Sequence, residues 1–538
     1  MPTITQRRRR LFLALAAFLL LGQMAFAMIT TALQQAPTID EPVYVATAEV
    51  YAQQHSLRYN PEHPPLGKLL IAAGLAFDDA ELDPAYPGNQ TQLGRHLLYE
   101  TGNNPFQLML LARLPVILVT LLIGLVVLGF ARDLAGWWGG LIALALYSFS
   151  PDVIAHGSLA TLDVPTAGLL LTTFWMLWRA RQRPRLYLPP AGLALGAALA
   201  TRMTALPAVP LVLLLALLAP AVLKTDRKWR ELGLRVVGAL GVGVLAVAVV
   251  WLVYLAVDPR LRWTPPVGLT NPGGLKGLAV DLLPLPKAYR DGLLIQFKFE
   301  RKTFTGFLLG EVYRGSLPKY YLPLALLIKT PLGMLALWAA GAVTMLVKPA
   351  LRLATLFLLL PAAVLMLVAM TGARPYGTRY VIFMPIFLAV VAGTVALIRL
   401  RWAWLGAAAL VGFVAVSSVR TFPYYLPYSN EAFGGTSQTH LNLHDSNVDW
   451  GQDLARLGTK LREDYPGEPV WLVYKGAGAP GYYGINGLNP YAVPNAQVRG
   501  LLVVSDSRVA LATGRLKQLI DSATPIDQVG YSITIYRR

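Results

Sequence analysis

Two adjacent carboxylates and a lysine lie close together near the start of this chain. Asp40 and Glu41 precede Pro42, and Lys68 ends the sequence Pro61-Glu62-His63-Pro64-Pro65-Leu66-Gly67-Lys68. A carboxylate can accept the proton of a hydroxyl, and the amides of a helix start together with an ammonium can hold a phosphate. Because this stretch follows a long apolar run, the residue types indicate chemistry at a membrane surface, on a phosphate that a lipid carries.

The two carboxylates have a structural alternative, which is helix capping. Thr38-x-x-Glu41 matches a capping box, but that register puts Pro42 at the fourth helical position, where its ring would clash with the Thr38 carbonyl. We therefore expect the helix to start at Pro42 and Asp40 to lie outside it without a capping role. Adjacent residues point in different directions, so we expect only one of the two to be the working carboxylate.

Three cationic residues could bind the phosphate. Lys68 opposes the helix dipole at a helix start, although it could also snorkel to the interface. Arg113 lies roughly two turns inside a predicted span, where an arginine usually faces a partner or a polar cavity. Arg202 lies at the outer edge, with snorkelling as its alternative. Asp163 begins a further span on the same side and could instead be an ordinary N-cap.

The composition places the chain among membrane proteins. Hydrophobic residues make up 55% of the 538 residues and charged residues 14%, compared with about 25% charged in soluble domains. Apolar runs of about 20 residues, long enough to cross a bilayer, recur over the first four-fifths of the sequence. We predict a polytopic α-helical protein with about eleven transmembrane helices, at residues 11–33, 107–130, 136–150, 164–178, 187–200, 205–223, 232–255, 322–347, 353–371, 380–398 and 402–419.

Basic clusters predict the orientation of these spans. With a cytoplasmic N-terminus, every dense cluster falls on the cytoplasmic side, namely Arg7 to Arg10, Arg132, Arg179 to Arg185, Lys224 to Arg230, Lys348 with Arg352, and Arg399 with Arg401. The net charge of +18 then reflects topology and contact with anionic membrane lipids, and no nucleic-acid partner is needed. The N-terminus also fits a cleaved signal peptide, but its apolar run continues to about Leu33, which favours an uncleaved anchor.

The sequence divides into a membrane domain, residues 1–421, and a less hydrophobic C-terminal domain, residues 422–538. Strand-like alternation at 470–474, 498–504 and 531–536, with helix-like segments at 449–462 and 507–520, predicts a small α/β domain. The orientation places it on the extracytoplasmic side, together with outer loops 34–105 and 256–321. The chain has no cysteine, which excludes disulfides, thiolate nucleophiles and Cys-ligated metals.

These residues carry a family resemblance. The first loop, with Asp40-Glu41 and His63 to Lys68, resembles the protein O-mannosyltransferases and the related bacterial lipid A aminoarabinose transferases. Supporting matches are Ala112-Arg113-Leu114, Leu162-Asp163-Val164-Pro165, Ala200 to Ala205 and Arg374-Pro375-Tyr376-Gly377-Thr378-Arg379-Tyr380. Those proteins are polytopic GT-C glycosyltransferases that use polyprenyl-phosphate sugars, so the resemblance implies a GT-C fold and a membrane glycosyltransferase, transferring a hexosyl or pentosyl group.

The resemblance also implies roles for the site residues. Asp40 would be the general base of a single displacement with inversion. Glu41 and Asp163 would be catalytic residues that orient the acceptor or the sugar. Lys68, Arg113 and Arg202 would hold the departing polyprenyl phosphate. Glu62, His63, Arg374 and Arg379 would orient the substrates. No cofactor and no metal site are implied.

The implied partners are a polyprenyl-phosphate sugar donor, membrane lipids and an acceptor hydroxyl on a lipid, a glycan or a protein. The implied location is the cell membrane (inner or plasma membrane), with several spans and an active site on the extracytoplasmic side. Ser429 to Glu431 and Asp445 to Asp453 resemble C-terminal segments of bacterial members. The β-trefoil insertion of the eukaryotic mannosyltransferases is not apparent, because loop 256–321 is too short for it, and this argues against a protein acceptor.

Three other motifs are weaker. Gly476 to Gly481 spells G-x-G-x-x-G, but no helix pattern follows it, as dinucleotide binding requires. Asp445-x-Asn447-x-Asp449 is similar to a calcium loop, yet Trp450 and Arg456 stand where glycine and glutamate are needed, so a structural turn is favoured. His440 and His444 lack a clear third zinc ligand.

Two non-enzymatic classes remain as alternatives. A transporter or flippase of polyprenyl-linked lipid would also have many spans, but transporters place ionisable groups near the middle of the membrane, whereas here the carboxylates gather at the outer rim. A cell-envelope scaffold would not explain carboxylates, lysine and arginine converging outside the membrane. The pattern therefore favours an enzyme.

Overall fold

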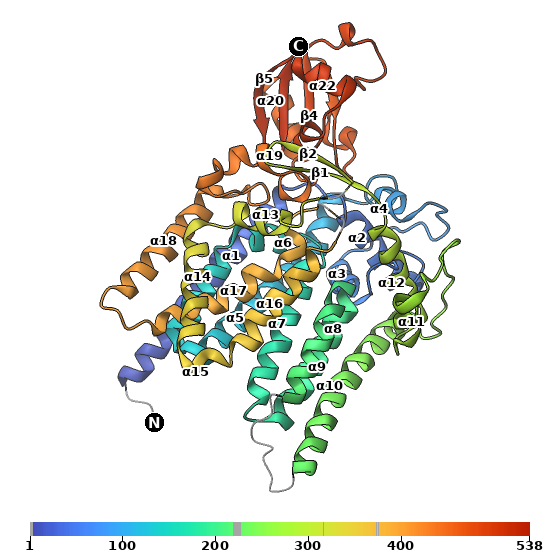
Figure 1. Cartoon of the computed structure of the whole chain (residues 1–538). Coiled ribbons are helices and arrows are strands. Elements are labelled where there is room, and N and C mark those ends of the chain that lie inside the picture. Colours follow the sequence, from blue (N-terminus) through green and yellow to red (C-terminus); the bar gives the residue numbers. More distant parts are fainter. Residues whose placement is uncertain (1–3, 219–227, 316, 373, 375) are drawn as a thin grey trace.

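The structure is a computed structural model, which describes residues 4–218, 228–315, 317–372, 374 and 376–538. Figure 1 shows a body of long helices below and a small domain with a sheet above, with the N-terminus at the lower end and the C-terminus at the upper end. Lys224 and Arg227, from one of the basic clusters, lie outside the described residues, as do residues 219–223 of the sixth predicted span.

Each of the eleven predicted spans is largely helical over its described residues. The helices concerned are α1 (Ile4–Gln34), α5 (Pro105–Ser148), α7 (Asp163–Ala180), α8 (Pro184–Thr201), η1 (Met203–Ala208) with α9 (Val209–Leu218), α10 (Lys228–Val257), α13 (Tyr321–Lys329), α14 (Leu332–Val347), α16 (Thr355–Ala369), η3 (Thr378–Val381) with α17 (Phe383–Gly393) and η4 (Thr394–Leu397), and α18 (Ala403–Thr421). Two short helices, α6 (Pro151–Gly157) and α15 (Pro349–Arg352), connect them.

Two predicted boundaries differ from the structure. The second and third spans form one element, α5, which kinks at Ala135 and at Gly136, whose φ of +72° is a conformation that favours glycine. The eighth span is broken instead. The chain bends by 117° between α13 and α14, beside Pro331, because proline cannot continue the backbone hydrogen bonds of a helix.

Four of the described helices are long and apolar enough to cross a membrane. They are Leu11–Gln34, Pro105–Ser148, Trp229–Val257 and Ala403–Thr421, and the bent pair α13–α14 makes a fifth if it counts as one span. The protein is therefore a multi-pass helical membrane protein with at least four apolar spans. The full number of eleven stays a prediction, because several of the other helices are shorter than the bilayer core requires.

The two outer loops fold into compact structure beside the helix ends. The first loop contains α2 (Glu41–Gln54), α3 (Leu66–Leu75) and α4 (Gln90–Tyr99), and α4 begins with a capping box formed by Asn89 and Gln92. The second contains α11 (Gly274–Leu282), α12 (Lys287–Glu300) and the antiparallel hairpin β1 (Phe304–Leu308)–β2 (Glu311–Gly315). Both loops lie at the end of the helical body that faces the C-terminal domain (Figure 1).

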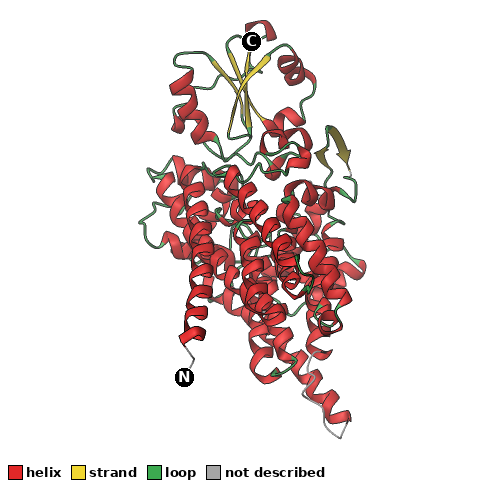
Figure 2. Cartoon of the chain, turned by 90° about the vertical axis from the view of Figure 1, so that its left-hand side faces the viewer, coloured by secondary structure: helices red, strands yellow, loops and turns green. Residues whose placement is uncertain are grey.

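The C-terminal domain is built on a four-stranded mixed sheet in the order β3-β4-β6-β5. β3 (Val470–Val473) pairs parallel with β4 (Leu501–Ser505), and β6 (Ile533–Arg537) pairs antiparallel with β4 and β5 (Thr524–Val529). The helices α20 (Leu454–Asp464), α21 (Asp506–Ala510) and α22 (Gly514–Asp521) lie beside this sheet (Figure 2). Alternate residues of β4 enter two different apolar clusters, so this strand is buried on both faces.

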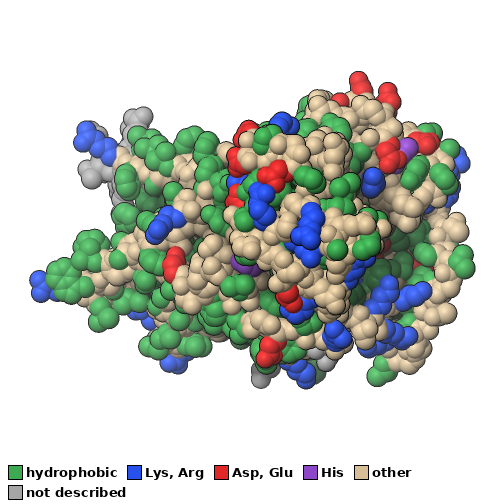
Figure 3. Space-filling model, turned by 90° about the horizontal axis from the view of Figure 1, so that it is seen from above, with side chains coloured by type: hydrophobic (Ala, Val, Ile, Leu, Met, Phe, Trp, Pro, Cys, Tyr) green, Lys and Arg blue, Asp and Glu red, His purple; other side chains and the backbone are tan. Residues whose placement is uncertain are grey.

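Short turns connect the last membrane helix to the sheet. They are η5 (Glu431–Phe433), η6 (Thr436–Gln438), α19 (Thr439–Asn442) and η7 (Asp445–Asn447), and η8 (Pro480–Tyr483) and η9 (Asn495–Gln497) follow β3. Seen from above, the face that carries the C-terminal domain presents charged side chains of both signs, whereas hydrophobic side chains dominate the arms that project beyond it (Figure 3).

The predicted α/β character of this region is confirmed, but three of its elements differ in detail. β5 was not predicted, because Pro525 and Asp527 interrupt the alternating pattern. The helix expected at 449–462 begins only at Leu454, and the helix expected at 507–520 is divided between α21 and α22. Residues 449–453 are consequently loop rather than helix.

The shared side of the outer loops and the C-terminal domain can be tested by cysteine labelling. Ala85 and Asn486 are exposed in the first loop and the C-terminal domain, and Gln182 is exposed at the opposite end of the helical body. In intact cells an impermeant thiol reagent should label Ala85→Cys and Asn486→Cys but not Gln182→Cys. Because the chain has no cysteine of its own, any labelling is specific, and labelling of only one of the first two positions would contradict the shared side.

Candidate active site

One pocket, with a volume of about 300 Å³, collects side chains from both outer loops and the helix ends below them. Its charged lining consists of two carboxylates and four cationic groups: Asp40, Glu62, Arg202, Lys302, Arg374 and Arg379. Its uncharged lining includes His63, Tyr44, Asn60, Gln90, Thr91, Phe299, Tyr376 and Tyr380. The surplus of positive charge suits a ligand that carries negative charge.

Asp40 stands immediately before α2 and points into this pocket. Its side chain makes no capping hydrogen bond, which confirms the prediction drawn from Pro42, although α2 begins at Glu41, one residue earlier than expected. Asp40 Oδ2 instead accepts a hydrogen bond of 2.6 Å from Nη1 of Arg379, and the carboxylate side chain remains 30% exposed. An arginine therefore holds the carboxylate in place while part of it stays open to the pocket.

Two arginines form the inner cationic wall of the pocket. Arg202 ends α8, pairs with Asp163 at the start of α7 and lies 5.4 Å from the centre of the Tyr380 ring. Arg379 lies 5.2 Å from the same ring. Both residues are 7% exposed, and in both the buried Nε has no hydrogen-bond partner within the described chain. Each arginine thus retains a donor for a ligand.

The rim of the pocket is held by polar contacts between the two outer loops. Arg374 donates to Gln296 Oε1 at 2.8 Å and pairs with Glu300 at 3.3 Å. Gln296 in turn donates to the carbonyl of Glu62 at 2.8 Å, and the carboxylate of Glu62 accepts from Gln90 at 2.7 Å. Glu62 is therefore engaged by neutral donors, in contrast to Asp40.

Glu41 and Arg113 form a bidentate ion pair that lies outside the pocket lining. Arg113 donates through Nε and Nη2 to the two oxygens of Glu41, each at 2.8 Å, and the two side chains are 1% and 0% exposed. Its remaining N–H groups donate to carbonyls at the end of α1, those of Ala32, Gln35 and Ala36. A guanidinium has five N–H donors, and these five contacts use all of them.

The surroundings keep Glu41 ionised. Burial raises the pKa of this carboxyl, but the Arg113 guanidinium and the amides of Thr38 and Ala160 lower it by more, so the pKa lies below its usual value. The pair links three helices: Glu41 starts α2, Arg113 lies in α5, and Arg113 also donates to carbonyls at the end of α1. Glu41 and Arg113 thus do not line the pocket, where catalysis and phosphate binding were expected. Their polar atoms are occupied by each other and by backbone groups.

Lys68 is also buried beneath the pocket. Its Nζ donates to the carbonyl of Asn60 at 2.9 Å, to Asn60 Oδ1 at 3.1 Å and to the carbonyl of His63 at 2.6 Å. An ammonium has three donors, so none is left for a phosphate. Lys68 instead shapes the turn from Asn60 to His63, whose residues line the pocket. His63 stays neutral, because burial and nearby cations lower its pKa well below the usual value.

Lys68 should give a measurable pH dependence of stability. Burial lowers its pKa to about 7, so between pH 7 and about 10 the unfolded chain binds a proton there that the folded protein releases. Stability must then rise with pH over this range, by up to about 1.4 kcal/mol per pH unit from this group. Thermal unfolding of wild type and Lys68→Met is measured at several pH values. The difference between their unfolding temperatures should change with pH, and a constant difference would contradict this prediction.

Part of the chain matches the model of a known protein family. Residues 16–259 match the family model described as Dolichyl-phosphate-mannose-protein mannosyltransferase. The match covers a little less than half of the chain. The expected resemblance to the mannosyltransferase family is thereby confirmed for that range. The matched range contains Asp40, Glu62, Asp163 and Arg202, whereas Arg379 lies beyond it.

Several solved structures are distantly similar. ArnT from Cupriavidus metallidurans in the apo state is 15% identical with a TM-score of 0.49, over 96% of this chain and 97% of that chain. The same protein bound to undecaprenyl phosphate is 14% identical with a TM-score of 0.47, over the same shares. The Saccharomyces cerevisiae Pmt1-Pmt2 complex bound to the sugar donor is 17% identical with a TM-score of 0.34, over 45% of this chain and 33% of that chain. A comparison with the curated proteins found no similar sequence.

The pocket gathers six of the ten site residues expected from the sequence, namely Asp40, Glu62, His63, Arg202, Arg374 and Arg379. Asp163 reaches it indirectly, through its ion pair with Arg202. Sequence reasoning missed Tyr44, Tyr376 and Tyr380, although the last two flank Arg379 in a segment that it singled out. Within the described residues, no group of three or more His, Asp or Glu side chains is placed to hold a metal ion.

Proposed function

We propose that the protein transfers a sugar from a polyprenyl-phosphate donor to a hydroxyl of an acceptor, on the extracytoplasmic side of the cell membrane and with inversion. One observation carries the proposal: a partly exposed carboxylate, Asp40, shares one pocket with two buried arginines that each retain a free donor. The glycosyltransferase family of residues 16–259 supports the reaction class, and the position of the pocket beside the outer loops supports the side.

In the proposed reaction Asp40 takes the proton of the acceptor hydroxyl while the oxygen of that hydroxyl attacks the anomeric carbon of the sugar. A bond forms between that oxygen and the carbon, the bond from the carbon to the phosphate oxygen breaks, and the electron pair stays on the phosphate. Attack from the side opposite the phosphate inverts the anomeric carbon. The products are the glycosylated acceptor and the polyprenyl phosphate, and the proton remains on Asp40 until solvent removes it.

Arg202 and Arg379 are the proposed phosphate ligands. Charge grows on the phosphate as it leaves, and buried donors aimed at growing charge stabilise the transition state more than the ground state. Asp163 orients Arg202 through their ion pair, and Tyr380 lies against both guanidiniums. This replaces the roles expected for Lys68 and Arg113, whose donors are occupied within the protein.

Glu62, His63 and Arg374 line the outer part of the pocket and would contact the sugar or the acceptor. A volume of about 300 Å³ lies at the lower end of the range for ligand pockets, which suits one sugar residue with its phosphate. The acceptor is a hydroxyl of a lipid, a glycan or a protein. The hydrocarbon chain of the donor would remain among membrane lipids.

The proposal is tested by donor binding and transfer with the purified protein. Undecaprenyl-phosphate sugars carrying a hexose or a pentose are offered, and mass spectrometry detects undecaprenyl phosphate as it is released. Arg202→Met should weaken donor binding by about 30-fold, which corresponds to about 2 kcal/mol for a buried charge contact. Arg262→Met, which changes an exposed arginine paired with the buried Asp258, is the control. Binding without release in the presence of any acceptor would favour a flippase or transporter instead.

A further inference from the structure

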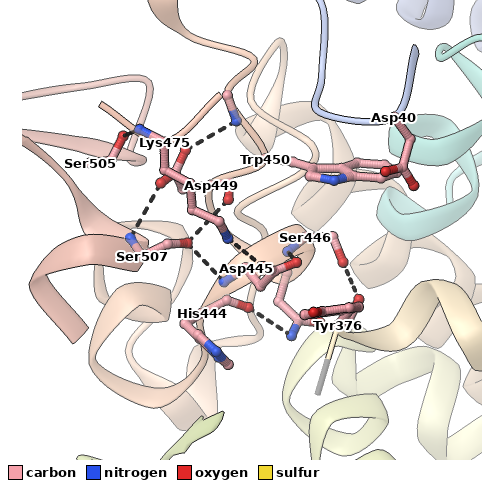
Figure 4. Close-up of polar contacts among 12 residues, drawn as sticks. Asp40, Tyr376, His444, Asp445, Ser446, Asp449, Trp450, Lys475, Ser505 and Ser507 are labelled. Atoms are coloured by element: carbon pink, nitrogen blue, oxygen red, sulfur yellow. Dashed lines mark hydrogen bonds and ion pairs between the residues drawn. The ribbon is translucent and has the colours of Figure 1, made fainter. Parts of the chain in front are cut away.

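We infer that residues 444–453, a loop of the C-terminal domain, position the Asp40–Arg379 pair and thereby complete the active site, with Asn447 and Trp450 as its positioning residues. The inference rests on the proposed function and extends it to a domain outside the family match. Figure 4 shows Trp450 of this loop near Asp40, and Ser446 of the loop against Tyr376.

The loop first holds the segment that carries Arg379. Asn447 Oδ1 accepts a 3.0 Å hydrogen bond from the amide of Thr378, the residue before Arg379. The hydroxyl of Ser446 donates to the carbonyl of Tyr376. Gly377 lies between them with φ +90°, and a Cβ there would come within 2.6 Å of Asn447 Oδ1. The backbone of residues 376–378 is therefore fitted closely against the loop.

The loop also supports the Arg379 side chain itself. The guanidinium carbon lies 4.4 Å from the centre of the Trp450 ring, a distance at which a cation is attracted to the ring face. An arginine has several rotatable bonds, so its charged end needs support of this kind to stay in one position. The indole ring limits Arg379 on the side away from the pocket, while Asp40 holds one of its terminal nitrogens.

The same loop holds the segment that carries Asp40. The amide of Ile39, the residue before Asp40, donates to the carbonyl of Trp450 at 3.1 Å. The amide of Ala36 donates to the carbonyl of Gln452 at 2.9 Å. Asp40 and Arg379 are 339 residues apart in the sequence, yet one loop binds the backbone immediately before each of them.

Anchors within the C-terminal domain make the loop a firm support. Lys475 pairs with Asp445, and the hydroxyl of Ser507 accepts from the amide of Asp445 at 2.8 Å and donates to the carbonyl of Asp449 at 3.1 Å (Figure 4). Ser532 donates to Asp453 at 2.6 Å. The loop is thus tied to the segment after β3, to α21 and to the turn before β6, so movement of that sheet would move it.

The residues of the loop that face the membrane domain are almost completely buried. Asn447 is 0% exposed and Trp450 is 1% exposed, and neither lines the pocket. They would not touch a substrate, so their effect on the reaction must pass through Arg379 and Asp40. The chain therefore places part of its catalytic geometry under the control of a separate domain.

A double-mutant cycle separates positioning from simple structural support. Trp450→Leu should lower single-turnover transfer 10- to 100-fold and weaken donor binding by a smaller factor, because Arg379 is displaced while Arg202 stays in place. Trp450→Phe should lower transfer less because a ring remains. Trp471→Leu, which changes a Trp in β3 of the same domain, should leave transfer unchanged. Arg379→Lys keeps the positive charge and should retain slow transfer. In this background Trp450→Phe should cause no further loss, because the effects of contacting residues are not additive. A full additional loss there would overturn the positioning role.

A second measurement does not depend on activity. Lys475→Met releases the loop from its anchor without changing any residue of the pocket. Hydrogen exchange should then speed up in two peptides, one with the amides of Ala36 and Ile39 and one with the amide of Thr378, while peptides from α7 and α8 stay unchanged. If exchange rises only inside the C-terminal domain, the loop does not position the pair. If exchange changes as expected but no sugar is transferred by wild type, the proposed function fails and the positioning role stands.

Discussion

Replacement of Asp40 by asparagine should lower sugar transfer by about 10²- to 10⁴-fold, the usual contribution of a general base. Asparagine keeps the shape of the side chain and can still accept a hydrogen bond from Arg379, but it cannot take the proton of the acceptor hydroxyl. Asp40 makes no capping hydrogen bond to α2 and its carboxylate is partly exposed, so the variant should insert and purify like wild type and lose less stability than Glu41→Gln. Donor affinity should stay within about 3-fold of wild type, because Arg202 and Arg379 remain.

The measurement is single-turnover transfer from an undecaprenyl-phosphate sugar, with donor binding in parallel. Glu62→Gln is the matched control, since it neutralises the other carboxylate of the pocket while keeping a group that can contact Gln90. This control should lose much less activity if Glu62 only orients a substrate. A large loss in Glu62→Gln with normal transfer in Asp40→Asn would assign the base to Glu62. Normal transfer in both variants would exclude carboxylate base catalysis in this pocket.

The second large effect concerns stability rather than catalysis. Glu41→Gln leaves Arg113 buried with a charge and no anionic partner, and loss of one member of a buried pair costs about 3–5 kcal/mol. We expect a marked fall in the unfolding temperature and in the yield of folded protein. Arg113→Met should have a similar effect, because it strands the Glu41 carboxylate and the carbonyls at the end of α1.

Thermal unfolding in the same detergent or lipid disc measures this effect. Asp133→Asn is the matched control: Asp133 pairs with Arg179, whose side chain is 26% exposed, and partly exposed pairs contribute about 0–1 kcal/mol. The double variant, with both Glu41 and Arg113 replaced, should lose less stability than the sum of the losses in the two single variants. If Glu41→Gln unfolds like wild type but loses transfer, Glu41 belongs to the catalytic group after all.

Some of these features could be predicted from the sequence because their physical causes are local. Apolar length and composition identify membrane helices wherever they occur. The ring of Pro42 excludes one capping register, and this alone separated Asp40 from a structural role. The family motif pointed to Arg202, Arg374 and Arg379 as site residues, and all three line the pocket.

Other features depend on which distant segments pack together. Whether Arg113 would face a phosphate or a carboxylate depended on the position of α2 against α5, 72 residues away. The same ambiguity held for Lys68, because a first-turn lysine can hold either a ligand or the carbonyls of a nearby turn, and only the path of residues 60–63 decides between them.

The sequence by itself determined the membrane class, the α/β character of the C-terminal region and the separation of Asp40 from Glu41, since hydropathy, alternation and proline geometry act over a few residues. Only the tertiary structure decided that Asp40 meets Arg379 and that residues 444–453 contact the segments that carry both. Such contacts join segments hundreds of residues apart, and a polar motif such as Asp445 to Asp453 contains no local signal for the surface that it will meet. The packing of the C-terminal domain on the helix ends supplies that information.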